Sequence, residues 1–325
     1  MRRNTLLAAL WVAFGLVWLP FAAEAQQAKL HRLGFLANHS PSWPPDQTFL
    51  QALRELGYIE GKNITIEVRY ARGNFDRLPE LARELVRLDV DLLFVAGDQA
   101  LKAAKEATDT IPILVAACDP LERLVVSIAR PAGKVTGATC ISSDLAGKRL
   151  QMLKELVPAL ARVAVLYNPD DRNKSFEYKA VQAAAHSMNL TLQAFEANSP
   201  SAIDEAFARM ASDQGAQALM ILADPFMNTH AQKLADLSLK NRLPAIYGFR
   251  LFADAGGLLS YGATIDWLMR RSASYVDRIF KGANPSDLPI EQPTTFELSI
   301  NLKTAKALGL TIPDKLLSVA DEVIE

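Results

Sequence analysis

Short apolar runs that end in Gly, Asn, Asp, Ser or Pro recur along this chain, and the same runs appear twice in the same order. Such a run is typical of a buried parallel strand that gives way to a loop. The matched pairs are LGFLANHS (33–40) with VAVLYNPD (163–170), DLLFVAGD (91–98) with ALMILADP (218–225), and IPILVA (111–116) with LPAIYG (243–248). The repetition predicts an α/β fold of two Rossmann-like lobes, each with a parallel sheet.

Amphipathic stretches lie between the apolar runs and predict the helices that cover each sheet. In residues 78–88, for example, Leu78, Leu81, Leu85 and Leu88 fall on one stripe of a helix. Strands and helices alternate regularly along the chain, which implies right-handed crossovers between parallel strands.

The chain after residue 141 is too long for a single lobe, so we expect it to cross between the lobes more than once. The expected division gives residues 31–140 plus 258–290 to lobe 1 and residues 141–257 plus 291–325 to lobe 2. Several crossings make a hinge, because a few linker residues absorb the backbone rotation of closure. Ligands bind outside the carboxyl ends of such strands, so the two lobes predict a ligand held in the cleft between them.

The N-terminal segment has the pattern of a secretory signal peptide. Arg2 and Arg3 precede an apolar stretch at residues 5–19, and Ala23-Glu24-Ala25 follows as an A-x-A cleavage site. We expect residues 1–25 to be removed by a cut after Ala25, which would place the mature protein in the periplasm. A retained membrane anchor is the alternative, but the stretch is short for a span of about 20 apolar residues.

Composition and charge narrow the function classes. The 325 residues are 50% hydrophobic and 22% charged, as in an ordinary globular protein, and the net charge of -1 offers no basic excess for nucleic acid. The sequence contains no Walker A loop, no G-x-G-x-x-G after the first strand, no G-x-S-x-G and no H-E-x-x-H. The four histidines are scattered, and each is expected at the surface or in a local hydrogen bond. We therefore predict no catalytic residue, no metal site and no cofactor.

Cys118 and Cys140 are the only cysteines. Both lie at or beside predicted strand ends, and their spacing is not that of a redox or zinc motif. An exported protein of this size can form a disulfide but does not need one, so the sequence leaves open whether the pair is bridged.

The loops at the predicted strand ends are where this fold places ligand contacts. Their carboxylates, hydroxyls and rings suit a small zwitterion with an apolar side chain. The candidate ligand-binding residues are Ser40, Trp43, Gly97, Asp98, Gln99, Asp119, Ser142 and Ser143 in the first half, and Tyr167, Asn168, Asp224, Phe226, Tyr247 and Phe249 in the second.

Each candidate also has a structural role available. Asp98 can be the N-cap of the helix that begins there, and Asp119 and Asp224 precede Pro and can shape turns. The two serines can cap a helix or form the hinge at the crossing. The aromatic residues at strand ends can belong to the core. Trp43, in a loop rich in proline, is the aromatic that packing explains least.

Long segments of the mature chain resemble the ABC-transporter substrate-binding proteins of the tryptophan/tyrosine-type branch. The matching segments are LRELGYIEGKNITIEVRYA (53–71), LPELARELVRLDVDLLFVAG (78–97), IARPAGKVTG (128–137), GKRLQMLKELVP (147–158), LPAIYGFRLFADAGGLLSYG (243–262) and DLPIEQPTTFELSINLKTAKALGLTIP (287–313). Segments this long and in this order are specific for the family.

The resemblance implies the type I periplasmic binding protein fold, capture of a small solute, and delivery to an ABC permease in the inner membrane with its cytoplasmic ATPase. Some relatives are associated with aromatic amino acids. This chain departs from the family at Asp98-Gln99 and at Cys118, and an added carboxylate at Asp98 favours an amine-bearing ligand. We therefore expect an amino acid or a related amine-bearing carboxylate, with Asp98 or Asp119 holding the positive end.

Two other function classes compete with transport. A periplasmic ligand sensor that reports to a membrane receptor or histidine kinase would use the same fold. An enzyme on a Rossmann-like scaffold would need a cofactor, or a nucleophile and base, in the cleft.

Overall fold

The computed structural model describes residues 30–41, 44–118, 127, 129, 133–171, 174–212 and 215–325. The expected signal peptide at residues 1–25 and the candidates Trp43 and Asp119 lie outside the described residues. None of the helices in the described ranges has the length and apolar character that a membrane crossing requires.

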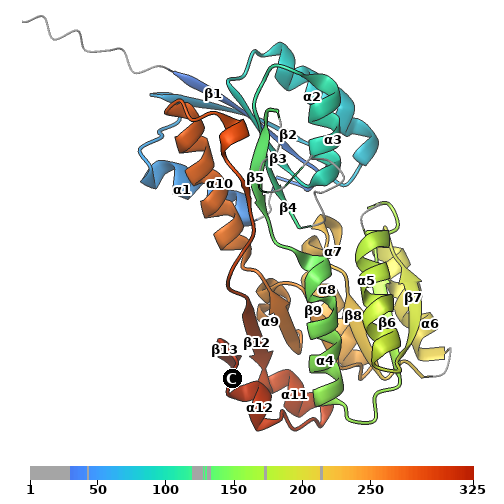
Figure 1. Ribbon diagram of the computed structural model, residues 1–325. Coiled ribbons are helices and arrows are strands. Elements are labelled where there is room, and N and C mark those ends of the chain that lie inside the picture. Colours follow the sequence, from blue (N-terminus) through green and yellow to red (C-terminus); the bar gives the residue numbers. More distant parts are fainter. Residues whose placement is uncertain are drawn as a thin grey trace, which may run out of the picture. The chain divides into compact units, whose positions relative to one another are not determined.

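Lobe 1 is built mainly from the first part of the described chain (Figure 1). Its strands are β1 (His31–Ala37), β2 (Ile64–Tyr70), β3 (Leu92–Ala96), β4 (Ile113–Ala117), β5 (Val135–Thr139) and β11 (Ile290–Glu291). Its helices are α1 (Pro44–Glu55), α2 (Leu78–Arg87), α3 (Asp98–Ala107) and α10 (Ile265–Phe280), with short 3₁₀ turns at Phe75–Arg77 and Pro285–Asp287.

Lobe 2 contains the remaining elements. Its strands are β6 (Arg162–Tyr167), β7 (Thr191–Glu196), β8 (Ala218–Ile221), β9 (Ala245–Tyr247), β10 (Leu259–Gly262), β12 (Glu297–Asn301) and β13 (Glu322–Ile324). Its helices are η3 (Ser142–Leu145), α4 (Ala146–Leu156), α5 (Lys174–Ser187), α6 (Pro200–Ser212), α7 (Pro225–Thr229), α8 (Ala231–Lys240), α9 (Arg250–Asp254), α11 (Leu302–Leu308) and α12 (Asp314–Leu317).

The two sheets repeat one strand order. Among the described residues, the first sheet has the order β11-β5-β4-β3-β1-β2 and the second the order β13-β12-β10-β9-β8-β6-β7. The five strands that begin each lobe therefore lie in the same sequence across the sheet, and these strands pair in parallel. The antiparallel pair β10 with β12 stands outside this repeat. The α/β fold of two Rossmann-like lobes with mostly parallel sheets is confirmed.

The described chain passes between the lobes three times: after β5, after β10 and between β11 and β12. The expected boundary at residue 258 was wrong, because residues 259–262 form β10 and pair with β9 in the second sheet. The physical reason is the repeat itself: lobe 2 needs its own fifth strand before the chain returns to lobe 1. Ile290–Glu291 likewise pairs with β5, so lobe 1 extends through residue 291.

Helices cover both faces of each sheet, and the central strands are apolar throughout for that reason. All five residues of β3 and of β4 are buried. In lobe 1, α1 and α10 pack on one face through side chains such as Phe49 and Tyr275, and α2 and α3 pack on the other through Leu85 and Leu101. Lobe 2 has the same arrangement, with α4 and α5 on one face and α6 and α8 on the other.

Cys118 and Cys140 form a disulfide, with their Cα atoms 4.4 Å apart. Each cysteine directly follows one of two adjacent parallel strands, β4 and β5. The bridge therefore ties two strand ends together where the chain leaves lobe 1 for the first time.

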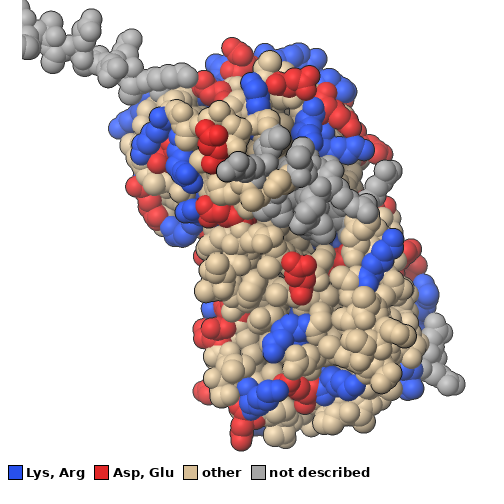
Figure 2. Space-filling view, in the orientation of Figure 1, with Lys and Arg blue, Asp and Glu red and all other residues tan. Residues whose placement is uncertain are grey.

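The surface seen in Figure 2 carries basic and acidic side chains that are interspersed over both lobes. This face therefore presents no single extended basic area.

Candidate ligand-binding cleft

A cleft between the carboxyl ends of the two sheets is lined by residues of both lobes and holds about 600 Å³ of empty space, part of it open to solvent. Lobe 1 contributes the residues that follow β1, β3 and β4, together with one face of α10. Lobe 2 contributes the residues that follow β8 and β9, together with the start of α5. Strand ends meet here because all five repeated strands of each sheet run in parallel.

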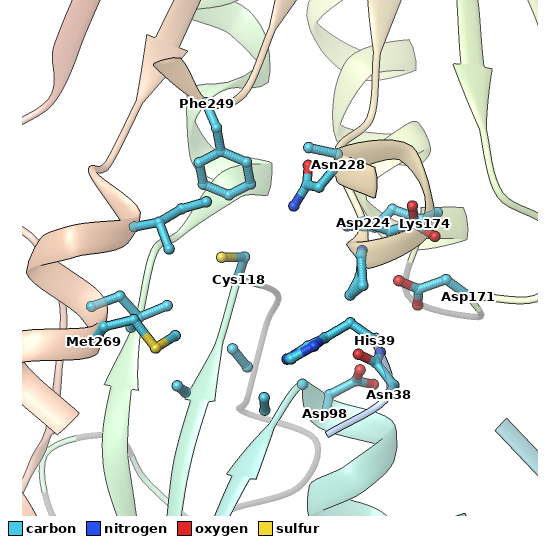
Figure 3. Close-up of a pocket in the computed structure, with 18 residues that line it drawn as sticks. Asn38, His39, Asp98, Cys118, Asp171, Lys174, Asp224, Asn228, Phe249 and Met269 are labelled. Atoms are coloured by element: carbon cyan, nitrogen blue, oxygen red, sulfur yellow. The ribbon is translucent and has the colours of Figure 1, made fainter. Parts of the chain in front are cut away.

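The polar wall of lobe 1 consists of Asn38, His39 and Asp98 (Figure 3). Asn38 and His39 directly follow β1 and are 5% and 3% exposed. Asp98 is the first residue of α3, next to Gly97, whose φ of +99° favours glycine. A Cβ added at Gly97 would lie 3.4 Å from Nδ2 of Asn38, so the asparagine amide rests against the glycine backbone.

His39 belongs to a buried polar cluster behind this wall. Its Nδ1 donates to the carbonyl oxygen of Ser40 at 3.0 Å, and its Nε2 lies 3.4 Å from Oδ1 of Asp46. The hydroxyl of Tyr70 donates to Oδ2 of Asp46 at 3.0 Å. Burial lowers the pKa of His39 to about 4 and raises the pKa of Asp46 to about 7, so His39 is neutral near neutral pH and Asp46 is protonated to a large extent below it.

An apolar wall faces this polar one. Ile265, Leu268 and Met269 come from the first turns of α10, and Ala96, Ala116 and Ala117 come from the ends of β3 and β4. The disulfide sulfur of Cys118 adjoins them, and the ring of Phe249 points into the same space from lobe 2 (Figure 3). This part of the cleft suits an apolar group of the ligand.

Asp224 and Asn228 form the lobe 2 wall together with Phe249. Asp224 is the N-cap of α7: its Oδ1 accepts the backbone N–H of Met227 at 2.6 Å, and its Oδ2 accepts from Nδ2 of Asn168 at 2.6 Å. The cap fixes the start of α7 and thereby places Asn228 on the cleft.

Lys174 opens α5 and is the only Lys or Arg among the described residues that line the cleft. Its Nζ donates to Oε2 of Glu177 at 2.9 Å, and Nη1 of Arg149 lies 3.3 Å from Oε1 of the same carboxylate. All three side chains are at most 3% exposed. Burial raises the pKa of Glu177, but Lys174 and Arg149 outweigh it and bring the pKa below its usual value.

Arg149 also ties this charged cluster to two crossings. It donates to the carbonyl and hydroxyl oxygens of Ser142, at the first crossing, at 3.2 and 3.1 Å. Its Nε donates to the carbonyl of Tyr261, in β10 just before the second crossing, at 2.8 Å. The hydroxyl of Ser142 in turn donates to Glu177 at 2.7 Å. One buried guanidinium thus connects the hinge with a lysine on the cleft.

The lobes also touch across the cleft through Gln99. Its amide nitrogen lies 3.3 Å from the carbonyl oxygen of Asp170 and 3.4 Å from Oδ1 of Asp171, both in lobe 2. Gln99 therefore bridges the two lobes beside the cleft.

The structure brings together some of the candidates and not others. Gly97, Asp98, Asp224 and Phe249 line the cleft. The candidates that do not line it are Ser40, Gln99, Ser142, Ser143, Tyr167, Asn168, Phe226 and Tyr247.

Several of these candidates have evident structural roles. Tyr247 is fully buried, stacks on Phe252 and donates to Ser238. Tyr167 donates to Glu196 on the neighbouring strand. Asn168 donates to Asp224, which lines the cleft, and Ser142 donates to Glu177, the partner of Lys174. Phe226 packs on the ring of His230.

Sequence reasoning missed Asn38, His39, Asp171, Lys174 and Asn228, which line the cleft as well. Asn38 and His39 lie inside the repeated segment 33–40, so its position after a strand was a signal for them. Lys174 begins α5 and Asn228 lies within α7, and neither had such a signal. No group of three or more His, Cys, Asp or Glu among the described residues is placed to hold a metal ion.

Two similar α/β lobes around a cleft are the architecture of the type I periplasmic binding fold. Comparison with known families agrees: residues 41–324 match the ABC transporter substrate binding protein family, and the chain belongs to it. It is therefore a substrate-binding protein and not an enzyme.

Individual relatives are distant in sequence but similar in fold. The tyrosine-binding protein of Clostridioides difficile (strain R20291) is 25% identical over 290 residues, covering 88% of this chain and 83% of that protein. An ABC domain from Streptococcus pneumonia in complex with L-Trp has a TM-score of 0.82 at 24% identity, covering 91% of this chain and 100% of that chain. A conserved domain protein from Vibrio cholerae has a TM-score of 0.84 at 24% identity, over 91% and 100% of the two chains.

Proposed function

We propose that the protein captures an amino acid, or a related amine-bearing carboxylate, in this cleft and delivers it to an ABC permease driven by a cytoplasmic ATPase. The observation that carries the proposal is the composition of the cleft, which places carboxylates and a lysine opposite an apolar wall. The ammonium of the ligand pairs with the carboxylates of the cleft, its carboxylate pairs with the lysine, and its apolar side chain packs on the apolar wall. The names of the tyrosine-binding and L-Trp-bound relatives fit this ligand class.

The energetics favour a ligand with both charged ends and an apolar part. Micromolar binding corresponds to about 8 kcal/mol. Burial of one large apolar side chain supplies about 1.5–3 kcal/mol, and each hydrogen bond to a charged group supplies about 1.5–3 kcal/mol. Neither kind of contact reaches the total alone. Closure of the lobes excludes water and strengthens the charged contacts.

Export to the periplasm is part of the same proposal. The pattern of residues 1–25 supports it, since a charged start, an apolar stretch and an A-x-A site precede the folded part. The protein purified from the periplasm of its native host, or of a Gram-negative expression host, is expected to begin at Gln26. A mature protein that retains Met1 would contradict this expectation, and intact-mass measurement decides between the two.

A thermal-shift screen tests the ligand class, because a ligand raises the melting temperature by mass action. We expect at least one of the standard amino acids to raise the melting temperature, and calorimetry then gives its affinity. Asp98→Asn should weaken that affinity at least tenfold, whereas Asp144→Asn, an exposed change in η3 away from the cleft, should leave it unchanged. A parent protein that binds no amino acid and no other amine-bearing carboxylate would overturn the proposal.

A further inference from the structure

Two asparagines that line the cleft, one from each lobe, carry buried acceptor atoms. Oδ1 of Asn38 and Oδ1 of Asn228 are both buried and have no hydrogen-bond partner among the described residues. Asn38 follows β1 in lobe 1, and Asn228 lies in α7 of lobe 2. Both side chains line the cleft, where Figure 3 shows them on different walls.

Unpartnered buried acceptors are uncommon in native proteins, because each loses its hydrogen bonds to water on burial. The backbone around Asn38 does not supply a donor to its Oδ1: the side chain rests with Nδ2 against Gly97, whose added Cβ would lie 3.4 Å from that nitrogen. The side chain is also 95% buried, since only 5% of it is exposed. A ligand in the cleft is therefore the natural source of the missing donors.

Both orphaned atoms are acceptors, so the group that satisfies them must donate. An ammonium carries three N–H donors and no acceptor, whereas a carboxylate carries acceptors alone. The surroundings agree, because Asp98 adjoins Asn38 and Asp224 caps the helix that carries Asn228. Negative charge on both sides favours a cation over a neutral N–H group.

We infer that Asn38 and Asn228 are the residues that make the cleft specific for an amine, each accepting an N–H of the ligand's ammonium group. This inference rests on the proposed function and specifies which end of the ligand the two lobes share. Because the acceptors come from opposite lobes, one ammonium satisfies both only when the lobes are together. The amine thus contributes to closure as well as to affinity, since water can serve each asparagine separately in an open form.

The experiment compares matched ligands on matched variants. The probes are L-tyrosine, L-tryptophan and L-leucine, their analogues without the amine (3-(4-hydroxyphenyl)propionate, indole-3-propionate and 4-methylpentanoate), and their analogues without the carboxylate (tyramine, tryptamine and 3-methylbutylamine). Affinities are measured by calorimetry for the parent and for Asn38→Leu, Asn228→Leu and Asn38→Asp. Asn301→Leu is the control, because Asn301 is as buried as Asn38 and caps α11 away from the cleft.

We expect the parent to prefer an amino acid over its amine-free analogue by at least 100-fold. Each leucine variant should lose about 10- to 100-fold in affinity for the amino acid and little for the amine-free analogue, so the preference collapses. Asn38→Asp keeps an acceptor in place and should retain the preference. Asn301→Leu should lower the melting temperature and leave the preference intact.

The outcomes separate this inference from the proposed function. A parent that binds an amino acid, with leucine variants that keep the full preference for the amine, overturns the inference alone. A parent that binds only the carboxylate-free amines, with affinity lost in the leucine variants, overturns the amino-acid proposal and supports the inference. A parent that binds amine-free carboxylates as well as amino acids, or that binds none of the probes, overturns the inference.

Discussion

The two lobes share one strand order but tie their hinge-side strand ends together by different chemistry. In lobe 1 the residues after β4 and β5 are Cys118 and Cys140, which are joined covalently. In lobe 2 the corresponding strands are β9 and β10, and the residues at their ends are Gly248 and Gly262. A Cβ on either glycine would lie 3.3 Å from Nη2 of Arg149, and a Cβ on Gly262 would also clash with the carbonyl oxygen of Gly248, so the strand ends and the guanidinium pack closely there.

The difference shows how one topology meets the same demand in two ways. Each lobe must fix two adjacent strand ends where the chain leaves for the other lobe. A disulfide does so directly and without charge. In lobe 2 Arg149 instead lies beside Gly248 after β9, donates to Tyr261 in β10 and to Ser142 at the first crossing, and pairs with Glu177. Reductant should therefore lower the stability of lobe 1, and the loss of a single charge should lower the stability of lobe 2.

The largest effect is expected from Arg149→Met. The substitution removes the hydrogen bonds to two crossings and leaves Glu177 with Lys174 as its one remaining cation among the described residues. Loss of one partner from a buried ion cluster costs about 3–5 kcal/mol in the free energy of unfolding, measured by urea denaturation.

Arg250→Met is the matched control for that prediction. Arg250 also lies near three carboxylates, those of Asp254, Glu297 and Glu322, but it is 43% exposed. Exposed ion pairs contribute about 0–1 kcal/mol, so its loss should be small. Equal losses from the two variants would show that burial at the hinge does not distinguish Arg149.

The disulfide is expected to contribute about 3 kcal/mol, since it closes a loop with a sequence separation of 22. The double variant Cys118→Ser/Cys140→Ser should therefore melt at a lower temperature than the oxidised parent. Reductant should lower the melting temperature of the parent and leave that of the double variant unchanged. If reductant shifts both proteins alike, the bridge is not what fixes the ends of β4 and β5.

Most of the fold could be predicted from the sequence because the repeat is a repeat of buried strands. Runs such as 33–40 and 163–170 became β1 and β6, which hold the same place in their sheets. The boundary at residue 258 was wrong because residues 259–262 resemble any buried strand, and only pairing with β9 assigns them to lobe 2.

The candidate site was accessible to sequence reasoning only where a strand end delivers the residue. Gly97, Asp98, Asp224 and Phe249 follow strands and line the cleft. Tyr247 also stands at a strand end, but its side chain is buried in the core. Successive side chains of a strand point to opposite faces of the sheet, so the position at a strand end does not by itself direct a side chain to the cleft. Met269 comes from α10, a helix that reaches the cleft only through the second crossing. Its position depends on tertiary structure that no local pattern encodes.

The buried polar cluster of His39 and Asp46 in lobe 1 should make the free energy of unfolding depend on pH. The variant Asp46→Asn tests this dependence. The raised pKa of Asp46, about 7, destabilises the fold as pH rises from about 4 to about 7. The lowered pKa of His39, about 4, destabilises it as pH falls from about 6.5 to about 4. The two slopes oppose each other in the parent.

In Asp46→Asn only the histidine slope remains, so the variant should gain stability relative to the parent as pH rises from about 4 to about 7. The expected change over that interval is on the order of 2 kcal/mol, read from urea denaturation at several pH values. The slope is the test, because any change in the strength of the hydrogen bond from Tyr70 adds only a constant offset. Asp144→Asn, a change at an exposed residue, is the control. If the stability of Asp46→Asn changes with pH as that of the parent does, the raised pKa of Asp46 is contradicted.

The smallest effect concerns the second crossing, where Thr264 caps α10 by accepting the backbone N–H of Trp267 at 3.2 Å. Thr264→Ala should cost about 1 kcal/mol, as loss of a cap usually does. The first turn of α10 also carries Ile265 and Leu268 to the cleft, so fraying there should weaken ligand binding a few-fold. Asn301→Ala removes the cap of α11, which does not reach the cleft, and should cost stability without weakening binding. If Thr264→Ala and Asn301→Ala affect ligand affinity equally, the start of α10 does not shape the ligand-binding site.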